Sequence, residues 1–272
     1  MKKKILAMVL ASAMALTMFA GCSGSSSGET VKKGTEKDGY QMVSPADTVK
    51  AAAGGKTHVL DVREWTNYAE GRVENSEWCP IFPLEDETLA DKMTEYAENH
   101  LEDGEEIYII CNSGARGAQK ATSVLKDAGI DEKLIFTVEG GAKALAKEKG
   151  ALTTNRTEEA IEWQYAKGAD VLKEEDAQIV DVRDDDTYAE GHLEGSVQVN
   201  LKDIESADAQ TKTFELAETL DNTKPVYFLC YSGNKCAKTA ISVFKDAGFP
   251  VENLFIIEDG AKDSDVSAAF VK

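Results

Sequence analysis

A cysteine lies where an apolar run ends and a helical pattern begins. Cys111 directly follows Ile107–Ile110, and Arg116 comes shortly after it, at the start of a helical pattern that Gly129 ends. The first N–H groups of such a helix and of the turn before it have no backbone partner, so they stabilise an anion held in front of them. A thiolate is an anion. We therefore expect Cys111 to be a reactive thiol rather than a buried structural cysteine.

The same arrangement occurs a second time, which favours the reactive interpretation. Leu60–Arg63 and Tyr68–Gly71 return at a constant spacing as Val180–Arg183 and Tyr188–Gly191. A second loop cysteine, Cys230, then follows its own apolar run at a spacing that is one residue shorter. Matches of this density over most of each half indicate a duplication, so we expect two domains of one fold.

Strands and helices are expected to alternate in each half. The first half has a strand over Thr57–Val62, a helix over roughly Asp86–Leu101, a strand before the cysteine and a last strand over Leu134–Val138. This order predicts an α/β fold with two domains, 39–152 and 153–272, each a central parallel sheet with helices on both faces. In such sheets functional residues lie at the carboxyl ends of the strands, and both cysteines are there.

The composition is acidic. Lys and Arg total 30 against 49 for Asp and Glu, which gives a net charge of −19. This charge argues against nucleic acid and against an anionic lipid surface as the main partner. Five cysteines are too few for a disulfide framework. The three histidines show no metal-ligand spacing, so we expect no metal site and no cofactor.

The N-terminus has the layout of a secretory signal. Three lysines precede the apolar segment Ile5–Ala20, and the small residues before Cys22 resemble a bacterial lipoprotein cleavage box, in which the cysteine is lipidated. The alternative is plain secretion with cleavage near Ala20. We expect a signal peptide over 1–21 and a flexible tether over 22–38. The protein would then be extracytoplasmic and held at the bacterial cell membrane through the lipid anchor alone.

Spaced motifs carry a family resemblance. Asp61–Arg63 with Tyr68–Gly71, the loop that starts at Cys111, and Glu139–Gly141 resemble a rhodanese (sulfurtransferase) domain, and the second half repeats them, with Asp259–Gly260 as its last motif. The resemblance covers nearly everything after the N-terminal segment. It implies a tandem-rhodanese lipoprotein. In that family a cysteine takes sulfane sulfur from thiosulfate or a persulfide donor, holds it as a persulfide and passes it to a thiol or cyanide acceptor.

Loop length separates two chemistries within this fold. Related cell-cycle phosphatases carry one more residue between the cysteine and the arginine, whereas here Asn112–Ala115 alone separate Cys111 from Arg116. A tight ring of N–H groups suits a single sulfur better than a tetrahedral phosphate ester. Sulfur transfer is therefore favoured over a phosphatase activity.

The resemblance assigns roles to the loop residues. Cys111 would be the nucleophile, and the loop N–H groups would stabilise both its thiolate and its persulfide. Arg116 would grip an oxyanion such as the sulfite part of thiosulfate, although a solvent-facing residue at a helix start is the alternative. Cys230 and Lys235 are their counterparts. The other residues expected to line the two loops are Asn112, Ser113, Gly114, Ala115, Gly117, Tyr231, Ser232, Gly233, Asn234 and Cys236.

Cys236 keeps a second function open. Together with Cys230 it could trap a persulfide or form a disulfide, so the alternative is a membrane-tethered thiol redox or sulfur-binding module with little turnover. The favoured interpretation is that Cys236 fills the place of a small residue at the helix start. Lys235 offers a point charge in place of a planar fork, and Asp259 adds a negative charge near Cys230. The first domain is therefore the expected more active site.

Other residues of the repeated motifs are expected to be structural. The acidic and basic residues at the ends of the first strands should fix neighbouring loops by ion pairs, Cys79 should pack in the core, and the paired glycines should let the last helix approach the cysteine loop. These residues are Asp61, Arg63, Asp181, Arg183, Cys79, Gly140 and Gly141.

Overall fold

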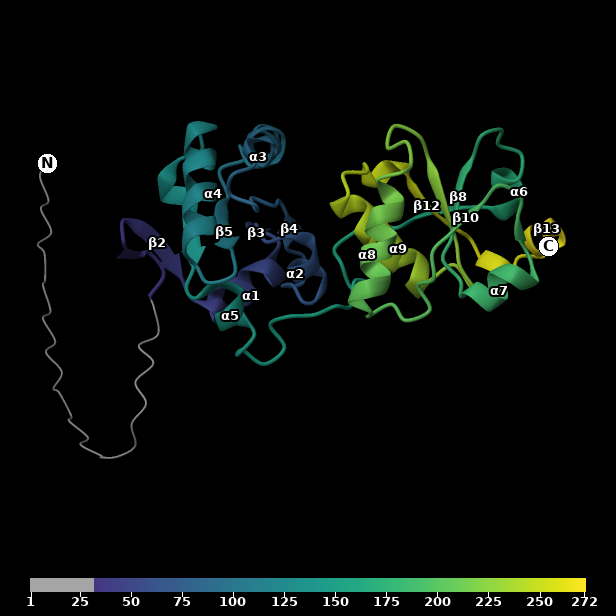
Figure 1. Cartoon of the computed structure of the whole chain (residues 1–272), viewed down its shortest axis with the longest axis horizontal. Helices are drawn as coiled ribbons and strands as arrows, with labels where there is room; N and C mark the ends of the chain where they lie inside the picture. Colours follow the sequence, from purple (N-terminus) through teal and green to yellow (C-terminus); the bar gives the residue numbers. More distant parts are fainter. Residues whose placement is uncertain (1–31) are drawn as a thin grey trace, which may run out of the picture. The chain divides into compact units, whose positions relative to one another are not determined.

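The computed structural model describes residues 32–272, and their first half forms a six-stranded sheet with helices around it (Figure 1). The strands are β1 (Thr35–Lys37), β2 (Tyr40–Val43), β3 (Thr57–Asp61), β4 (Glu77–Trp78), β5 (Glu106–Ile110) and β6 (Ile135–Val138). They lie in the order β1-β2-β6-β5-β3-β4, and every pairing except that of β1 with β2 is parallel. The helices are α1 (Pro45–Gly54), α2 (Trp65–Ala69), α3 (Glu87–His100), α4 (Arg116–Asp127), the 3-10 turn η1 (Glu132–Leu134) and α5 (Gly141–Leu145).

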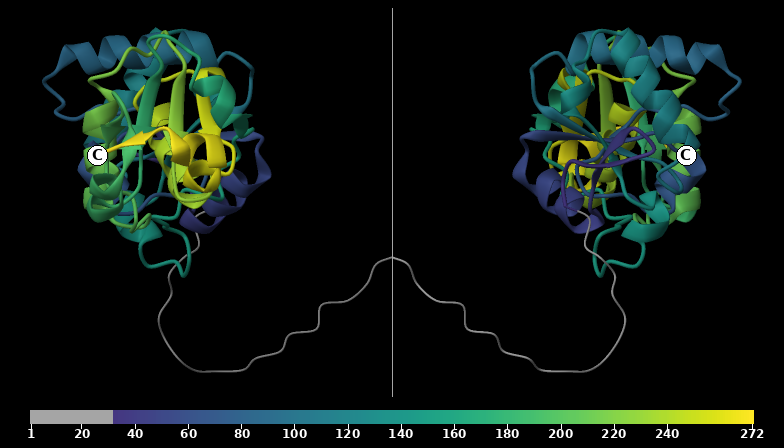
Figure 2. Two further views of the ribbon diagram at one scale, coloured as in Figure 1. Left: turned by 90° about the vertical axis from the view of Figure 1, so that its right-hand side faces the viewer. Right: turned by 90° about the vertical axis from the view of Figure 1, so that its left-hand side faces the viewer.

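The second half repeats this architecture with a five-stranded parallel sheet, whose strands lie side by side in the left view of Figure 2. Its order is β10 (Val197–Gln198), β8 (Gln178–Asp181), β11 (Val226–Leu229), β12 (Leu254–Ile257) and β7 (Gln164–Ala166). A separate antiparallel pair joins β9 (His192–Leu193) to β13 (Phe270–Val271). The helices are α6 (Gly168–Val171), α7 (Asp185–Glu190), α8 (Ala207–Ala217), α9 (Lys235–Asp246), η2 (Val251–Asn253), η3 (Gly260–Lys262) and α10 (Ser264–Ala268).

Helices cover both faces of each sheet, because successive residues of a strand point to opposite sides. Ile107 and Ile109 of β5 pack with α3 and α4, whereas Tyr108 and Ile110 pack with α1 and α5. In the second half, residues of β11 alternate in the same way between a core with α8 and α9 and a core with α6 and α10. The predicted fold class, two α/β domains with parallel sheets covered on both sides, is therefore confirmed.

The helix after the first cysteine begins and ends as its sequence predicts. Its buried residues recur at helical spacing, and Gly129 follows it with a left-handed φ of 97°. The N–H of Gly129 donates to the carbonyl of Lys126 and the N–H of Ile130 to that of Leu125, the pairing of a Schellman motif. Gly248 and Phe249 end α9 with the same two bonds. Each cysteine loop therefore leads into a helix with a fixed length and a buried face.

The expected tether is partly wrong at its C-terminal end. Thr35–Lys37 lies inside the segment 22–38 but forms β1, which pairs with β2. Asp38 and Gly39 close this hairpin with φ values of 53° and 82°, the left-handed conformations that a two-residue turn needs. The Asp-Gly pair was the signal for it, and the polar residues around it hid the strand.

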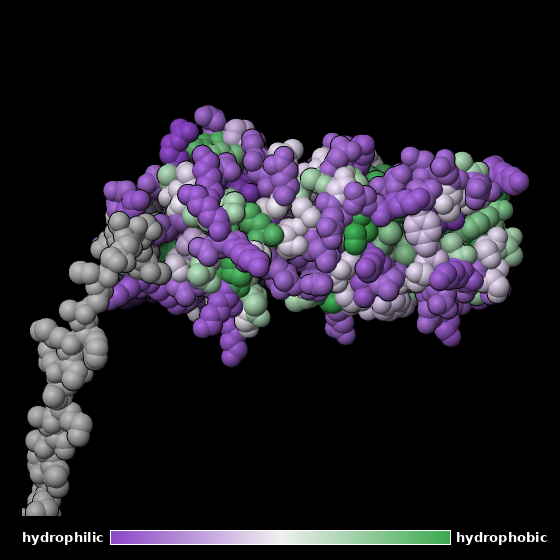
Figure 3. Space-filling view, turned by 90° about the horizontal axis from the view of Figure 1, so that it is seen from below, coloured by the Kyte–Doolittle hydropathy of each residue, from purple (hydrophilic) through white to green (hydrophobic). Residues whose placement is uncertain are grey.

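The predicted signal peptide over 1–21 and the lipidation of Cys22 lie outside the described residues and stay predictions. Among residues 32–272, no helix combines the length and the apolar character that crossing a membrane requires. In the space-filling view of Figure 3, hydrophilic side chains predominate on the face shown, consistent with the net charge of −19.

Candidate active site

The first cysteine loop joins the carboxyl end of β5 to the start of α4. The backbone N–H of Ala115 donates to Cys111 Sγ at 3.4 Å, which is a direct amide contact to the sulfur. Gly114 takes a φ of 65°, and a Cβ built on it would lie 2.6 Å from the carbonyl oxygen of Val138. The tight turn that brings the amide to the sulfur therefore requires glycine at this position.

The start of α5 holds this loop from the other side. The N–H of Ala142 donates to the carbonyl of Cys111 at 2.8 Å, and that of Lys143 to the carbonyl of Asn112 at 3.2 Å. A Cβ on Gly141 would lie 2.1 Å from the carbonyl oxygen of Cys111. The prediction that the paired glycines let the last helix approach the cysteine loop is confirmed.

The second cysteine loop has the same backbone geometry. The N–H of Asn234 donates to Cys230 Sγ at 3.2 Å, and the N–H of Ala261 donates to the carbonyl of Cys230 at 2.8 Å. Gly260 packs as closely as its counterpart, because its Cβ would lie 2.2 Å from the same carbonyl oxygen. Asp259 has a φ of 60°, close to the 68° of Gly140, its counterpart in the first domain. The aspartate therefore replaces a glycine without changing the path of the chain.

The two thiols are nearly covered, whereas the basic residues beside them are open to solvent. Cys111 and Cys230 are each 2% exposed. Arg116 and Lys235 are exposed at the first position of α4 and α9, and neither pairs with a carboxylate of the described residues. Each loop therefore offers a nearly covered sulfur that accepts a hydrogen bond from one backbone amide, with an exposed basic residue at the start of the helix that follows.

The ion pairs expected at the ends of the first strands are present. Arg63 donates from Nε and Nη2 to the carboxylate of Asp61 and from Nη2 to the carbonyl of Gly71, at 2.8 Å. Arg183 makes the same contacts with Asp181 and Gly191. All four charged side chains are buried. They fix the loop after each strand and touch neither thiol, so their predicted structural role is confirmed.

Tyr231, expected to line the second loop, is held by a neighbouring loop. Its hydroxyl accepts from the N–H of Asp184 at 2.8 Å and donates to the Asp184 carboxylate. That carboxylate also pairs with Lys202 at 2.9 Å. The hydrogen bond from Tyr231, followed by the N–H of Thr187, holds the pKa of Asp184 well below its usual range. Tyr231 therefore shapes the rim of the loop through its bond to Asp184.

Phe82 is a site residue that the sequence analysis missed. A Cβ built on Gly117 would lie 2.5 Å from the Phe82 ring and 3.1 Å from Cys111 Cβ, so the ring covers the helix start beside the cysteine. The same place in the second repeat holds Lys202. The alignment of the two halves contained this difference, but the segment before α3 carries no motif that marks it.

Cys79 lies in the core of the first domain. It is 5% exposed and packs in the cluster that contains Leu60, Val62 and Ile81. Burial raises the pKa of its thiol to about 12. The prediction that Cys79 is a packing residue is confirmed.

His58 lies between two carboxylates away from the cysteine loop. Its Nδ1 is 2.8 Å from Glu77 Oε1 and its Nε2 is 3.1 Å from Asp103 Oδ2, and an oxygen of Glu105 lies in the same group. The hydrogen bond with Glu77 is the largest cause that raises the pKa of His58 to about 9. A protonated imidazole with both nitrogens donating has no lone pair for a metal ion, so this group is an ion-pair cluster.

This cluster predicts a pH dependence of stability. The folded pKa of His58 lies above its ordinary 6.5, so the stabilisation is complete below pH 6.5 and is lost as the pH rises to about 9. We expect a loss of about 1–2 kcal/mol across that range after allowance for solvent screening. The free energy of unfolding of the unsubstituted protein (the parent) and of His58→Gln, measured over this pH range, tests the prediction. A parent curve no steeper than that of the variant would contradict the prediction.

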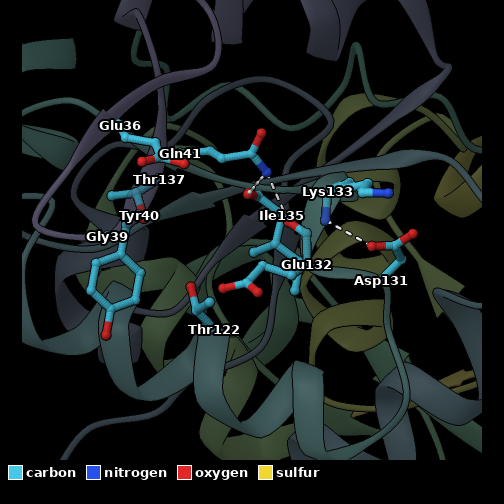
Figure 4. Close-up of a pocket in the computed structure, with 10 residues that line it drawn as sticks. All are labelled: Glu36, Gly39, Tyr40, Gln41, Thr122, Asp131, Glu132, Lys133, Ile135 and Thr137. Atoms are coloured by element: carbon cyan, nitrogen blue, oxygen red, sulfur yellow. Dashed lines mark hydrogen bonds between the residues drawn. The ribbon is translucent and has the colours of Figure 1, made fainter.

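Several surface hollows of the described residues lie away from the cysteine loops. Figure 4 shows one between the β1–β2 hairpin and η1, where Gln41 Nε2 donates to the carbonyls of Glu132 at 2.8 Å and Ile135 at 3.2 Å. These bonds tie the hairpin to the sheet.

A family model and a relative both relate this chain to rhodanese-like proteins. The model of the rhodanese-like domain matches residues 44–148 and again 166–263. A thiosulfate sulfurtransferase, GlpE, from Pseudomonas fluorescens is 38% identical over 81 residues, which are 30% of this chain and 65% of that relative. This chain therefore spans a little less than two thirds of that relative's length.

Among solved structures, a thiosulfate sulfurtransferase from Pseudomonas aeruginosa is similar at 18% identity and a TM-score of 0.39, over 80% of this chain and 41% of that one. SseA from Escherichia coli, described among 3-mercaptopyruvate sulfotransferases, is 18% identical with a TM-score of 0.33, over 80% of this chain and 97% of that one. The two segments that the family model matches, 44–148 and 166–263, cover most of this chain. The chain therefore belongs to the rhodanese-like domain family and carries that domain twice.

Proposed function

We propose that the protein is a sulfurtransferase that moves sulfane sulfur from thiosulfate or a persulfide donor to a thiol or cyanide acceptor. The observation that carries the proposal is the amide contact to the sulfur in both loops, from Ala115 to Cys111 and from Asn234 to Cys230. Amides directed at a sulfur stabilise a thiolate and, after transfer, a persulfide anion. The relative from Pseudomonas fluorescens, a thiosulfate sulfurtransferase, supports the same chemistry.

The reaction divides into two displacements on sulfur. The Cys111 thiolate attacks the sulfane sulfur of thiosulfate, the S–S bond of the donor breaks, and sulfite leaves with the electron pair. The terminal sulfur of the persulfide then accepts attack by a thiolate or cyanide, which carries that sulfur away and restores the Cys111 thiolate. Both steps start from an anionic nucleophile, so neither needs a general base.

Arg116 is proposed to bind the departing sulfite. Its guanidinium is exposed and free of a carboxylate partner among the described residues, so its paired N–H groups are available for two parallel hydrogen bonds to an oxyanion. In the second loop Lys235 would bind the sulfite instead, through a single mobile positive charge. Asp259 also adds a negative charge near Cys230, which disfavours an anionic donor there. We therefore propose that the first domain carries most of the thiosulfate turnover.

The site of action is proposed from the N-terminal sequence. Three lysines, an apolar segment and small residues before Cys22 favour an extracytoplasmic protein held at the membrane by a lipid on that cysteine. Metabolic labelling with a fatty-acid analogue, compared between the parent and Cys22→Ser, tests this anchor. Equal labelling of both proteins would reject it.

Single cysteine variants test the assignment of the two loops. We expect Cys111→Ser to lose most of the thiosulfate-dependent turnover, because serine is a far weaker nucleophile toward sulfur, and Cys230→Ser to keep most of it. Cys79→Ser, at a buried packing site, controls for the loss of a thiol in itself. Unchanged turnover in Cys111→Ser rejects the choice of domain, and unchanged turnover in the double variant Cys111→Ser/Cys230→Ser rejects the proposed function.

A further inference from the structure

The two cysteine loops differ by a paired exchange at one place. In the first domain Gly117 lies at the second position of α4 and the Phe82 ring occupies the space beside it. In the second domain the same two positions of the repeat hold Cys236 and Lys202. Lys202 pairs instead with Asp184 at 2.9 Å. Where the aromatic ring is absent, a thiol is present.

The backbones of the two loops agree closely enough to transfer distances from one to the other. Ala115 and Asn234, the residues before each helix, have φ, ψ of −132°, −124° and −142°, −122°. Gly114 and Gly233 have φ of 65° and 60°. A Cβ built on Gly114 would lie 2.6 Å from the carbonyl oxygen of Val138, and one built on Gly233 would lie 2.7 Å from that of Ile257.

This agreement places the Cβ of Cys236 next to the Cβ of Cys230. A Cβ built on Gly117 lies 3.1 Å from Cys111 Cβ, and Cys236 carries a real Cβ at the equivalent position. Disulfides join Cβ atoms that are about 3.5–4.5 Å apart, so a shift of a few tenths of an ångström brings the pair into that range. Both thiols are free in the structure.

The surroundings of Cys236 agree with this contact. Its side chain is half-buried and packs against the core cluster that contains Cys230. Burial, and after it the nearby Cys230, raise the pKa of Cys236 to about 11. Cys236 is therefore a mostly protonated thiol beside the sulfur that the second loop would load.

We propose that Cys236 is a resolving thiol that attacks the Cys230 persulfide and converts it to a Cys230–Cys236 disulfide. The inference rests on the proposed function for the loading of Cys230. Cys236 Sγ forms a bond to Cys230 Sγ, the bond between Cys230 Sγ and the outer sulfur breaks, and the outer sulfur leaves with the electron pair. It takes the proton of the Cys236 thiol and departs as hydrosulfide.

The two domains then deliver sulfur in different forms. The first domain has Gly117 in place of the second thiol, so its persulfide waits for an external acceptor. The second domain reduces the sulfane sulfur to sulfide and oxidises its own two thiols, so each cycle needs an external thiol to reduce the disulfide. The chemical class of its product is thus sulfide rather than a persulfide or thiocyanate.

Full-length Cys111→Ser isolates the second loop for the test. We expect its reaction with thiosulfate, without acceptor and without oxygen, to release one sulfide per chain. Peptide mapping should then find Cys230 joined to Cys236, with the loss of two hydrogens. Cys111→Ser/Cys236→Ser should instead keep one added sulfur on Cys230 and release no sulfide, and Cys236→Gly in the same background reproduces the first domain and should behave alike.

The pH dependence separates a reacting thiol from a packing residue. Sulfide release should hold at neutral pH and fall as the pH approaches 11, because the leaving sulfur takes the proton of the Cys236 thiol and that thiol has a pKa of about 11. A mild disulfide-forming oxidant such as diamide should also join Cys230 to Cys236 without any sulfur donor. This reaction tests the geometry independently of sulfur loading.

The possible failures are distinguishable. A stable persulfide on Cys230 in Cys111→Ser, with no sulfide released, would overturn the resolving role and leave the proposed function intact. If diamide joined the two cysteines but no variant gained sulfur from thiosulfate, the loading step of the proposed function would be wrong, and the resolving role with it.

Discussion

Gly141→Ala is expected to disrupt the first cysteine loop and abolish sulfur uptake at Cys111. The new Cβ would lie 2.1 Å from the carbonyl oxygen of Cys111 and 2.7 Å from the N–H nitrogen of Gly114, and both are backbone atoms. The φ of 57° adds a left-handed conformation that alanine disfavours. We expect the free energy of unfolding of this domain to fall by more than about 4 kcal/mol, measured by calorimetry together with persulfide mapping.

Gly129→Ala is the matched control for that variant. Gly129 has a φ of 97°, but a Cβ there meets nothing within 4 Å. It therefore carries the left-handed penalty without the clash, about 1–2 kcal/mol, and should keep Cys111 reactive. If Gly141→Ala cost no more than Gly129→Ala, the close approach of α5 to the loop would not matter for the site.

Arg156→Met is expected to destabilise the second domain by about 3–5 kcal/mol. Arg156 is fully buried, and it donates to Gln210 Oε1 at 2.8 Å and to Asp246 Oδ2 at 2.6 Å. Its removal leaves the Asp246 carboxylate, whose side chain is 3% exposed, with Lys245 Nζ at 3.9 Å as the remaining cation. A buried charge without its hydrogen-bonded partner carries most of this cost.

Two further variants check that explanation. Asp246→Asn in the Arg156→Met background should restore part of the stability, because it removes the unpaired charge. Lys126→Met breaks an exposed pair with Glu132, whose side chains are 42% and 56% exposed, and should cost less than about 1 kcal/mol. Equal losses for Arg156→Met and Lys126→Met, measured by chemical unfolding, would refute the argument from burial.

The parts of the fold that depend on local patterns could be predicted from the sequence. The strands before Cys111 and Cys230 are continuous apolar runs, and the helices after them show helical spacing and a terminal glycine. The duplication supplied a second copy of every signal. The position of each cysteine at a strand-to-helix corner followed from these features alone.

Contacts between distant segments could not be predicted in the same way. Arg72 is 1% exposed and pairs with Glu159, and Arg156 reaches Gln210 and Asp246, yet no spacing in the sequence links these residues. Isolated charged residues in polar segments are ordinarily exposed, so their burial had no signal.

The same limit applied to the surroundings of the cysteines. Phe82 reaches the helix start beside Cys111 from a segment without regular structure. Asp259 takes a left-handed conformation that glycine would favour, and only the backbone reveals that the loop keeps its shape. What a loop contacts depends on the packing of the whole domain, whereas its own turn depends on a few neighbouring residues.

The strands at the borders of both sheets are short, and this has a consequence for self-association. The outer strands β1, β4, β7 and β10 contain three, two, three and two residues. Each therefore presents few unpaired main-chain groups onto which a neighbouring molecule could add a strand. Copies of the protein crowded together at high concentration should consequently resist the edge-to-edge pairing that leads to aggregates.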